Sequence, residues 1–199
     1  LDVISQNTSR LYQGTKDFIW SINPGNDNLY EIIIRIKDFG DELFYGTGCE
    51  FEVKGLQEEF KNITYYGRGE IENYWDKYKS AKVGLYEDIV TEKMVNYLQP
   101  QENGAKTDVR YLEIKNEKGD GIKISGVPTF EFNISKYHPE DVEIADHFYK
   151  LKPLDATVLR IIYKQMGVGG DDSWRALPHP EYILNPNKIY TLTYEIKPI

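Results

Sequence analysis

Hydrophobic and polar residues alternate along most of this chain, a pattern that predicts β-strands with one buried face. The clearest example is the stretch in which Phe130, Phe132 and Ile134 are separated by polar residues. Clusters of Gly, Pro, Asn and Asp interrupt these stretches at short spacing, which is typical of an antiparallel β-sandwich or a β-barrel. The predicted strands cover residues 18–22, 30–36, 43–53, 109–114, 122–124, 129–135, 158–163 and 189–196.

One short helix is predicted among the strands. It begins at Pro139, a residue type favoured in the first turn of a helix. Val142, Ala145 and Tyr149 then follow at helical spacing. His147 would lie on this helix, where a local hydrogen bond is the simplest role for its imidazole.

The length and the cysteine count fit a single large domain. The 199 residues contain no internal repeat, low-complexity tract or linker, so we predict one domain over residues 1–199. A β-rich domain of this size buries a core that needs no disulfide, and the one cysteine, Cys49, could form none within the chain. The first residue is Leu1, with neither an initiator Met nor a secretion signal, so the chain is expected to be a fragment of something longer.

Charge and composition limit the classes of partner that this chain could bind. A formal net charge of −8 argues against nucleic acids and anionic membranes. No apolar run approaches the ~20 residues that a transmembrane helix needs. We expect a soluble chain, cytoplasmic or periplasmic, whose compartment the sequence does not reveal. The 16 Tyr and 3 Trp suit β-sheets, and they also suit sugar-binding surfaces, where a flat ring lies against a pyranose.

Catalytic and metal-binding motifs are scarce. His138, His147 and His179 stand far apart, without metal-ligand spacing, and the Gly-x-Ser-x-Gly elbow of serine hydrolases is missing. No cofactor site is therefore predicted in this chain. The 32 Asp and Glu residues leave a paired-carboxylate glycosidase site open. The adjacent Asp171 and Asp172 should point apart, however, and make a poor acid and nucleophile couple.

The loop at residues 166–174 is the main candidate for a binding site. It follows an apolar strand, and its three glycines let the backbone turn where a Cβ would clash. The large indole of Trp174 either plugs the end of a β-sandwich, which composition alone favours, or presents an aromatic face to a ligand. The other loop residues, Gly167, Gly169, Gly170, Asp171, Asp172 and Ser173, are predicted to cap and brace the loop.

Five motifs together carry a family resemblance. They are Tyr-Gly-Arg-Gly-Glu-Ile-Glu-Asn-Tyr-Trp-Asp at 66–76, Pro-Gln-Glu-Asn-Gly at 100–104, Phe-Asn-Ile-Ser-Lys-Tyr at 132–137, Gly-Val-Gly-Gly-Asp-Asp-Ser-Trp at 167–174 and Pro-Glu-Tyr at 180–182. Arg110, after the second motif, and His147, within the predicted helix, also belong to the set. In this order and spacing they resemble the C-terminal, or small-chain, domain of family 2 β-galactosidases. The resemblance runs from about Phe18 to the end of the chain, and the Gly-Gly-Asp-Asp-Ser-Trp loop is its most specific part.

The resemblance implies a large antiparallel β-sandwich of the galactose-mutarotase-like type, the last domain of a multidomain enzyme. It places the catalytic glutamates and the magnesium and sodium ligands on other domains, chiefly a TIM barrel, and none on this chain. It assigns Trp174 to the wall of the galactose pocket. The resemblance therefore favours an indole that contacts substrate over one that packs into the end of the sandwich. The implied partners are a β-galactoside and the remaining domains of the same enzyme, and the resemblance leaves room for a homo-oligomer of the parent.

Two departures and three alternatives remain at this point. Glu70-Ile71-Glu72 stands where the family usually has Pro-x-Glu, and the family's domain begins upstream of Leu1. A free-standing carbohydrate-binding module would show a shallow strip of exposed aromatic residues. A mutarotase-like epimerase would need a His, with His147 as the candidate, converging with a Glu in one cleft. A purely structural interface domain would need neither feature.

Overall fold

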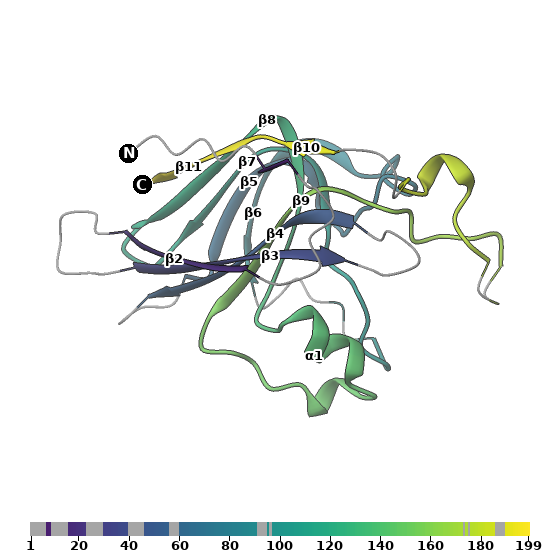
Figure 1. Cartoon of the computed structure of the whole chain (residues 1–199), viewed down its shortest axis with the longest axis horizontal. Coiled ribbons are helices and arrows are strands. Elements are labelled where there is room, and N and C mark those ends of the chain that lie inside the picture. Colours follow the sequence, from purple (N-terminus) through teal and green to yellow (C-terminus); the bar gives the residue numbers. More distant parts are fainter. Residues whose placement is uncertain are drawn as a thin grey trace.

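The structure, a computed structural model, describes residues 7–8, 16–22, 30–39, 46–55, 60–90, 95, 97–172, 174, 176–185 and 190–199, with side chains from residue 60 onward. This part of the chain is an antiparallel all-β sandwich with one short helix, as the sequence predicts (Figure 1). The helix is α1 (Pro139–Ile144), and 3₁₀ turns span Phe148–Lys150 and Pro180–Tyr182. The strands are β1 (Asn7–Thr8), β2 (Lys16–Ile22), β3 (Tyr30–Phe39), β4 (Gly46–Gly55), β5 (Asn62–Gly69), β6 (Lys82–Ile89), β7 (Lys106–Lys115), β8 (Gly121–Ser135), β9 (Thr157–Gln165), β10 (Thr191–Leu192) and β11 (Tyr194–Pro198).

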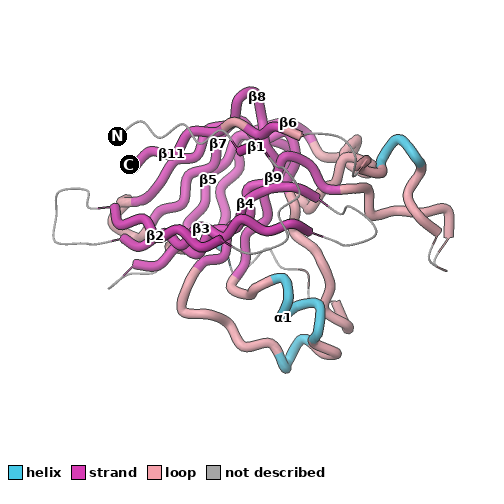
Figure 2. Tube along the Cα trace, in the orientation of Figure 1, coloured by secondary structure: helices cyan, strands magenta, loops and turns pink. Residues whose placement is uncertain are grey.

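In the described part of the chain, nine strands form one sheet, in the order β2-β3-β4-β9-β8-β7-β5-β6, with β11 pairing with β8 beside this path. β1 and β10 pair separately. In Figure 2, β2, β3 and β4 lie below β11, β7 and β5, so the sheet curves over into two layers. β7 and β8 form a hairpin, because they run antiparallel with Lys115 opposite Gly121.

The hydrophobic core lies against β5, β7, β8 and β9. Side chains along β5 alternate between buried and less buried positions over most of the strand, as a one-sided sheet requires. The C-terminal part of β8 differs, because Glu131 and Asn133 are buried along with the apolar residues between which they lie. Among the described side chains, the largest fully buried ones are Tyr65, Phe130, Phe132, Leu112, Ile114, Ile124, Leu159, Ile161 and Ile162.

The predicted helix is too long. α1 ends at Ile144, and Ala145 already has extended backbone angles, with φ −74° and ψ 125°. The helix buries only Val142, so little packing supports further turns. His147 therefore lies beyond α1, directly before the 3₁₀ turn at Phe148–Lys150.

Two strand predictions also need correction. Residues 65–69 form the end of β5, although the sequence pattern predicts no strand there. The last predicted strand is divided at Thr193, because β10 pairs with β1 while β11 pairs with β8. Residues 43–45 and Ile189, also predicted as strand, lie outside the described residues.

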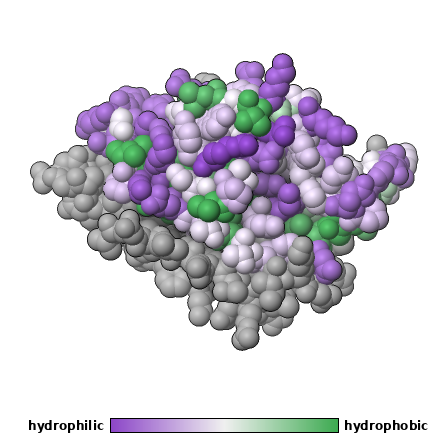
Figure 3. All heavy atoms as spheres, turned by 90° about the horizontal axis from the view of Figure 1, so that it is seen from above, coloured by the Kyte–Doolittle hydropathy of each residue, from purple (hydrophilic) through white to green (hydrophobic). Residues whose placement is uncertain are grey.

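Among the described residues, the surface seen from above is mainly hydrophilic, with separate hydrophobic spots (Figure 3). Within the described residues, no helix combines the length and the apolar character needed to cross a bilayer. The yellow-green segment after β9 runs out to the right, away from the sheet, in Figure 1.

Candidate functional site

The Trp174 loop, defined as residues 166–179, connects the end of β9 to the 3₁₀ turn at Pro180–Tyr182. The side chain of Trp174 is 86% exposed. An indole this exposed is not packed into the sandwich, so the loop presents an aromatic face to the surroundings of this chain.

Two neighbouring aspartates hold the loop in shape. Asp172 Oδ1 accepts the backbone N–H groups of Trp174 at 2.7 Å and Ala176 at 3.3 Å, which is a local turn built by a side chain. Asp171 Oδ1 lies 2.8 Å from His179 Nε2, and this hydrogen bond raises the pKa of His179. The two carboxylates thus have separate structural contacts, as their adjacency suggested. Ser173, the sixth predicted supporting residue, lies outside the described residues.

At two of the three loop glycines, neighbouring atoms leave no room for a side chain. A Cβ on Gly167 would lie 2.6 Å from Asp76 Oδ2 and 2.8 Å from Tyr182 Cβ. A Cβ on Gly170 would lie 2.1 Å from the carbonyl oxygen of Ala176, whereas at Gly169 the nearest atom would be Asp76 Oδ2 at an ordinary 3.6 Å. The expected clash with a Cβ therefore exists at Gly167 and Gly170 but not at Gly169.

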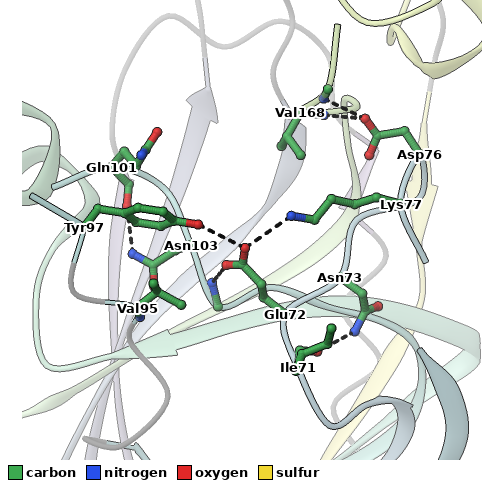
Figure 4. Close-up of polar contacts among 12 residues, drawn as sticks. Ile71, Glu72, Asn73, Asp76, Lys77, Val95, Tyr97, Gln101, Asn103 and Val168 are labelled. Atoms are coloured by element: carbon green, nitrogen blue, oxygen red, sulfur yellow. Dashed lines mark hydrogen bonds and ion pairs between the residues drawn. The ribbon is translucent and has the colours of Figure 1, made fainter. Parts of the chain in front are cut away.

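A distant aspartate tethers the loop to the sandwich. Asp76 Oδ2 accepts the N–H groups of Val168 at 2.7 Å and Gly169 at 2.8 Å (Figure 4). Nearby, the Gly167 N–H donates to the carbonyl oxygen of Tyr182 at 2.8 Å. The start of the Trp174 loop is therefore fixed both to the turn after β5 and to the 3₁₀ turn that follows the loop.

Aromatic packing reinforces this tether. The ring of Trp75 meets that of Tyr182 edge to face, with centroids 5.2 Å apart. The ammonium of Lys164, near the end of β9, lies 4.2 Å from the Trp75 ring centroid, within cation–π range. Trp75 thus packs against both sides of the base from which the loop extends.

The anchor segment, residues 71–77, is itself held firmly (Figure 4). Asn73 is fully buried and accepts two hydrogen bonds from Thr107, one from the backbone N–H and one from the hydroxyl. Glu72 accepts the N–H of Gly104 at 2.9 Å and also contacts Tyr97 and Lys77, each at 3.3 Å. These contacts join the anchor segment to the loop that precedes β7.

A second polar cluster connects the loop that precedes β7 to the sheet. Glu102 accepts two hydrogen bonds from Arg160 Nη2, at 2.8 and 2.7 Å, and one from Asn133 at 2.8 Å. Asn133 also donates to the carbonyl oxygen of Asn103. The motifs at 66–76, 100–104, 132–137 and 167–174, far apart in sequence, thus form one connected polar framework.

Glu131 is the most perturbed carboxyl group with a described environment. It is 5% exposed on β8, and burial raises its pKa to about 7. Its Oε2 accepts the N–H of Gln165 at 2.9 Å, at the end of β9. The group therefore contacts the last residue of β9, directly before the Trp174 loop begins.

The histidines form no catalytic cluster among the described residues. His147 lies 3.5 Å from Asp146, both at the surface, and His179 contacts Asp171. The His and Glu pair that a mutarotase-like site would need is not assembled around His147 within this part of the chain. In the same residues, no group of three or more His, Cys, Asp or Glu could hold a metal ion.

Sequence reasoning identified the exposed Trp174 but not the residues behind it. Asp76 lies 92 residues before Val168, and the sequence gives no periodic or motif signal for such a contact. The available signal was indirect, because the motif that ends in Asp76 accompanies the Trp174 motif in the resemblance. That co-occurrence could have suggested that the two segments meet.

Comparisons with known proteins agree on one family. The family model described as "Beta galactosidase small chain" matches residues 25–196. A β-galactosidase of Priestia megaterium (strain DSM 319 / IMG 1521) is 51% identical over 144 residues, which cover 72% of this chain and 14% of that protein. A β-galactosidase of Streptococcus thermophilus is 37% identical over 153 residues, or 76% of this chain and 15% of that protein. The chain thus spans only a small part of the length of these relatives.

Proposed function

The chain belongs to the β-galactosidase small-chain family, and we propose that it serves as the non-catalytic, substrate-contacting domain of a retaining β-galactosidase. The parent enzyme would hydrolyse terminal β-D-galactosides, as the names of the relatives suggest. The observation that carries this proposal is the 86% exposed Trp174 on a loop fixed by many contacts. A large aromatic ring held out from the sandwich in this way is suited to stack on a sugar.

We propose that Trp174 forms one wall of the galactose pocket. The C–H face of galactose is apolar, so an indole beneath it would stabilise the bound sugar by burying apolar surface from both partners. Asp172, Gly170 and the Asp76 tether restrict the loop before substrate arrives, so less conformational entropy is lost on binding. The rest of the pocket would come from the other domains.

We propose that hydrolysis itself occurs on other domains, chiefly a TIM barrel, which would also hold magnesium and sodium. A retaining mechanism needs two carboxyl groups about 5 Å apart, one as acid and one as nucleophile. The carboxylates near Trp174 have structural partners instead: Asp171 binds His179, Asp172 caps the turn and Asp76 tethers the loop. The purified chain alone should therefore turn over no chromogenic galactoside.

The test is Trp174→Ala in the intact enzyme that contains this chain. Loss of the stacked ring should weaken galactoside binding roughly ten- to a hundredfold, seen mainly in KM, because the stacking is worth about 1–3 kcal/mol in total. The melting temperature should stay almost unchanged, since an exposed side chain contributes little to stability. Trp174→Phe should recover much of the affinity, and Trp174→Leu little.

The opposite pattern would reject this role. If Trp174→Ala lowers the melting temperature of the intact enzyme and leaves kcat/KM unchanged, the indole is an interdomain packing residue. A galactoside that is hydrolysed by the chain alone, with loss of activity on mutation of one of its own carboxylates, would reject the non-catalytic assignment.

A further inference from the structure

The carboxylate of Asp76 has a geometry suited to fixing a loop. A single oxygen, Oδ2, accepts two consecutive backbone N–H groups, those of Val168 and Gly169, at 2.7 and 2.8 Å. Hydrogen bonds to a charged acceptor are the stronger class. The other oxygen, Oδ1, is buried and has no hydrogen-bond partner among the described residues. The interaction of Asp76 with the loop therefore depends on one oxygen atom.

Asp76 is itself held by a rigid base. Three residues earlier, Asn73 is fully buried and bonded to Thr107 at the start of β7. A turn closed by the Lys77 N–H and the Tyr74 carbonyl at 2.8 Å then carries Asp76 toward the loop. Tyr74 is 3% exposed, so the turn is seated in the sandwich. The backbone from which the Asp76 side chain extends is therefore held against the sandwich by Asn73 and Tyr74.

The loop is shaped to receive the carboxylate. A Cβ at Gly167 would lie 2.6 Å from Asp76 Oδ2 and 2.9 Å from its Cγ. The glycine therefore leaves the space that the carboxylate occupies, directly before the two N–H groups that it accepts. Only a few residues then separate these N–H groups from Trp174, whose own N–H is held by Asp172.

From this arrangement we propose that Asp76 is a positioning residue: by fixing the start of the Trp174 loop, it sets the affinity for the galactoside without touching it. This inference rests on the proposed role of Trp174 and adds a residue that acts only through it. Lys77 is adjacent in sequence but pairs with Glu72 at 3.3 Å, so the positive charge next to Asp76 is directed elsewhere.

The test compares three variants in the intact enzyme. Asp76→Leu keeps the branched shape of the side chain but replaces both oxygens with methyl groups that accept no hydrogen bond. Asp76→Asn keeps one carbonyl oxygen that can accept both N–H groups. Asp155→Leu makes the first change at an exposed carboxylate outside the loop and the anchor segment. Hydrogen exchange of peptides covering Val168 and Gly169 reports the tether directly, and galactoside kinetics report its consequence.

We expect Asp76→Leu to accelerate exchange of these two amides roughly tenfold or more, since hydrogen bonds to a charged group give the larger protection. Peptides from β7 and β8 should exchange as in the wild type. KM should rise with little change in kcat, Asp76→Asn should recover most of the loss, and Asp155→Leu should match the wild type.

A double-mutant cycle separates positioning from a general defect. Because Asp76 acts through Trp174, Asp76→Leu should raise KM in the wild-type background but add little to Trp174→Ala. An equal rise in both backgrounds, or unchanged exchange at Val168 and Gly169, would overturn the inference. If Asp76→Leu does not fold, Gly167→Ala displaces the carboxylate from the loop side and should give the same result in the cycle. If Trp174→Ala itself leaves KM unchanged, the proposed function fails instead.

Discussion

Asn73→Ala should be one of the most destabilising single changes in the described part of the chain. The side chain is fully buried and makes four hydrogen bonds. Its Nδ2 donates to the carbonyl oxygens of Arg68 and Ile71, both at 3.1 Å, and its Oδ1 accepts the Thr107 N–H at 3.0 Å and the Thr107 hydroxyl at 2.5 Å. Truncation to Ala removes all four bonds and leaves buried groups without partners.

The magnitude follows from these contacts. A net contribution of about 1 kcal/mol per hydrogen bond, with a further penalty for an unsatisfied buried N–H, gives a loss of about 3–5 kcal/mol. This is a large fraction of the roughly 5–15 kcal/mol by which a domain is usually stable. With an m-value of about 2 kcal/mol/M, the urea midpoint should fall by about 2 M while m stays constant.

The assay is urea unfolding of the 199-residue chain, followed by circular dichroism. Asn62→Ala is the matched control, because Asn62 is half-buried and donates one described hydrogen bond, to Asn116 at 3.5 Å. Its free energy of unfolding should change by less than about 1 kcal/mol. If Asn73→Ala loses no more stability than Asn62→Ala, the anchor segment is not the rigid base that we infer.

Two further predictions concern Glu131 and the loop glycines. The pKa of Glu131 is raised from 4.5 to about 7, so the free energy of unfolding should fall by on the order of 3 kcal/mol as pH rises through this window. In urea titrations at several pH values, Glu131→Gln should make the free energy of unfolding less dependent on pH. An unchanged pH dependence would contradict this prediction. Gly170→Ala should raise KM in the intact enzyme, because its Cβ would lie 2.1 Å from the Ala176 carbonyl oxygen. Gly169→Ala, one residue away, should leave KM near the wild-type value; similar effects at both positions would refute this steric argument.

Much of the fold was predictable because its signal is local. Alternating residues such as Phe130, Phe132 and Ile134 indicate a strand whatever it pairs with, and β8 contains all three. The helix was overpredicted for the same reason, since Val142, Ala145 and Tyr149 satisfy helical spacing without packing to support it. Periodicity does not reveal that Ala145 turns to an extended backbone.

Of the candidate site, only Trp174 was predictable from the sequence. Trp174 stands out by residue type and by its glycine-rich neighbours, but its exposure depends on packing that spacing does not determine. The residues behind it were not predictable by pattern. Asp76 and Val168 are 92 residues apart, and Glu102 and Arg160 are 58 apart, so each contact depends on the completed sheet.

The close approach of Asp76 to Gly167 also limits how this loop can be changed or transplanted. A side chain at position 167 and a carboxylate at position 76 would compete for the same space. In a set of related sequences, the two positions should therefore vary together, with Asp at one accompanied by Gly at the other. A designer who grafts the Gly-Gly-Asp-Asp-Ser-Trp loop onto another β-sandwich would need to bring the turn with Asp76 as well. Without that turn, the start of the transplanted loop would lack its tether, and the orientation of the tryptophan would not be fixed.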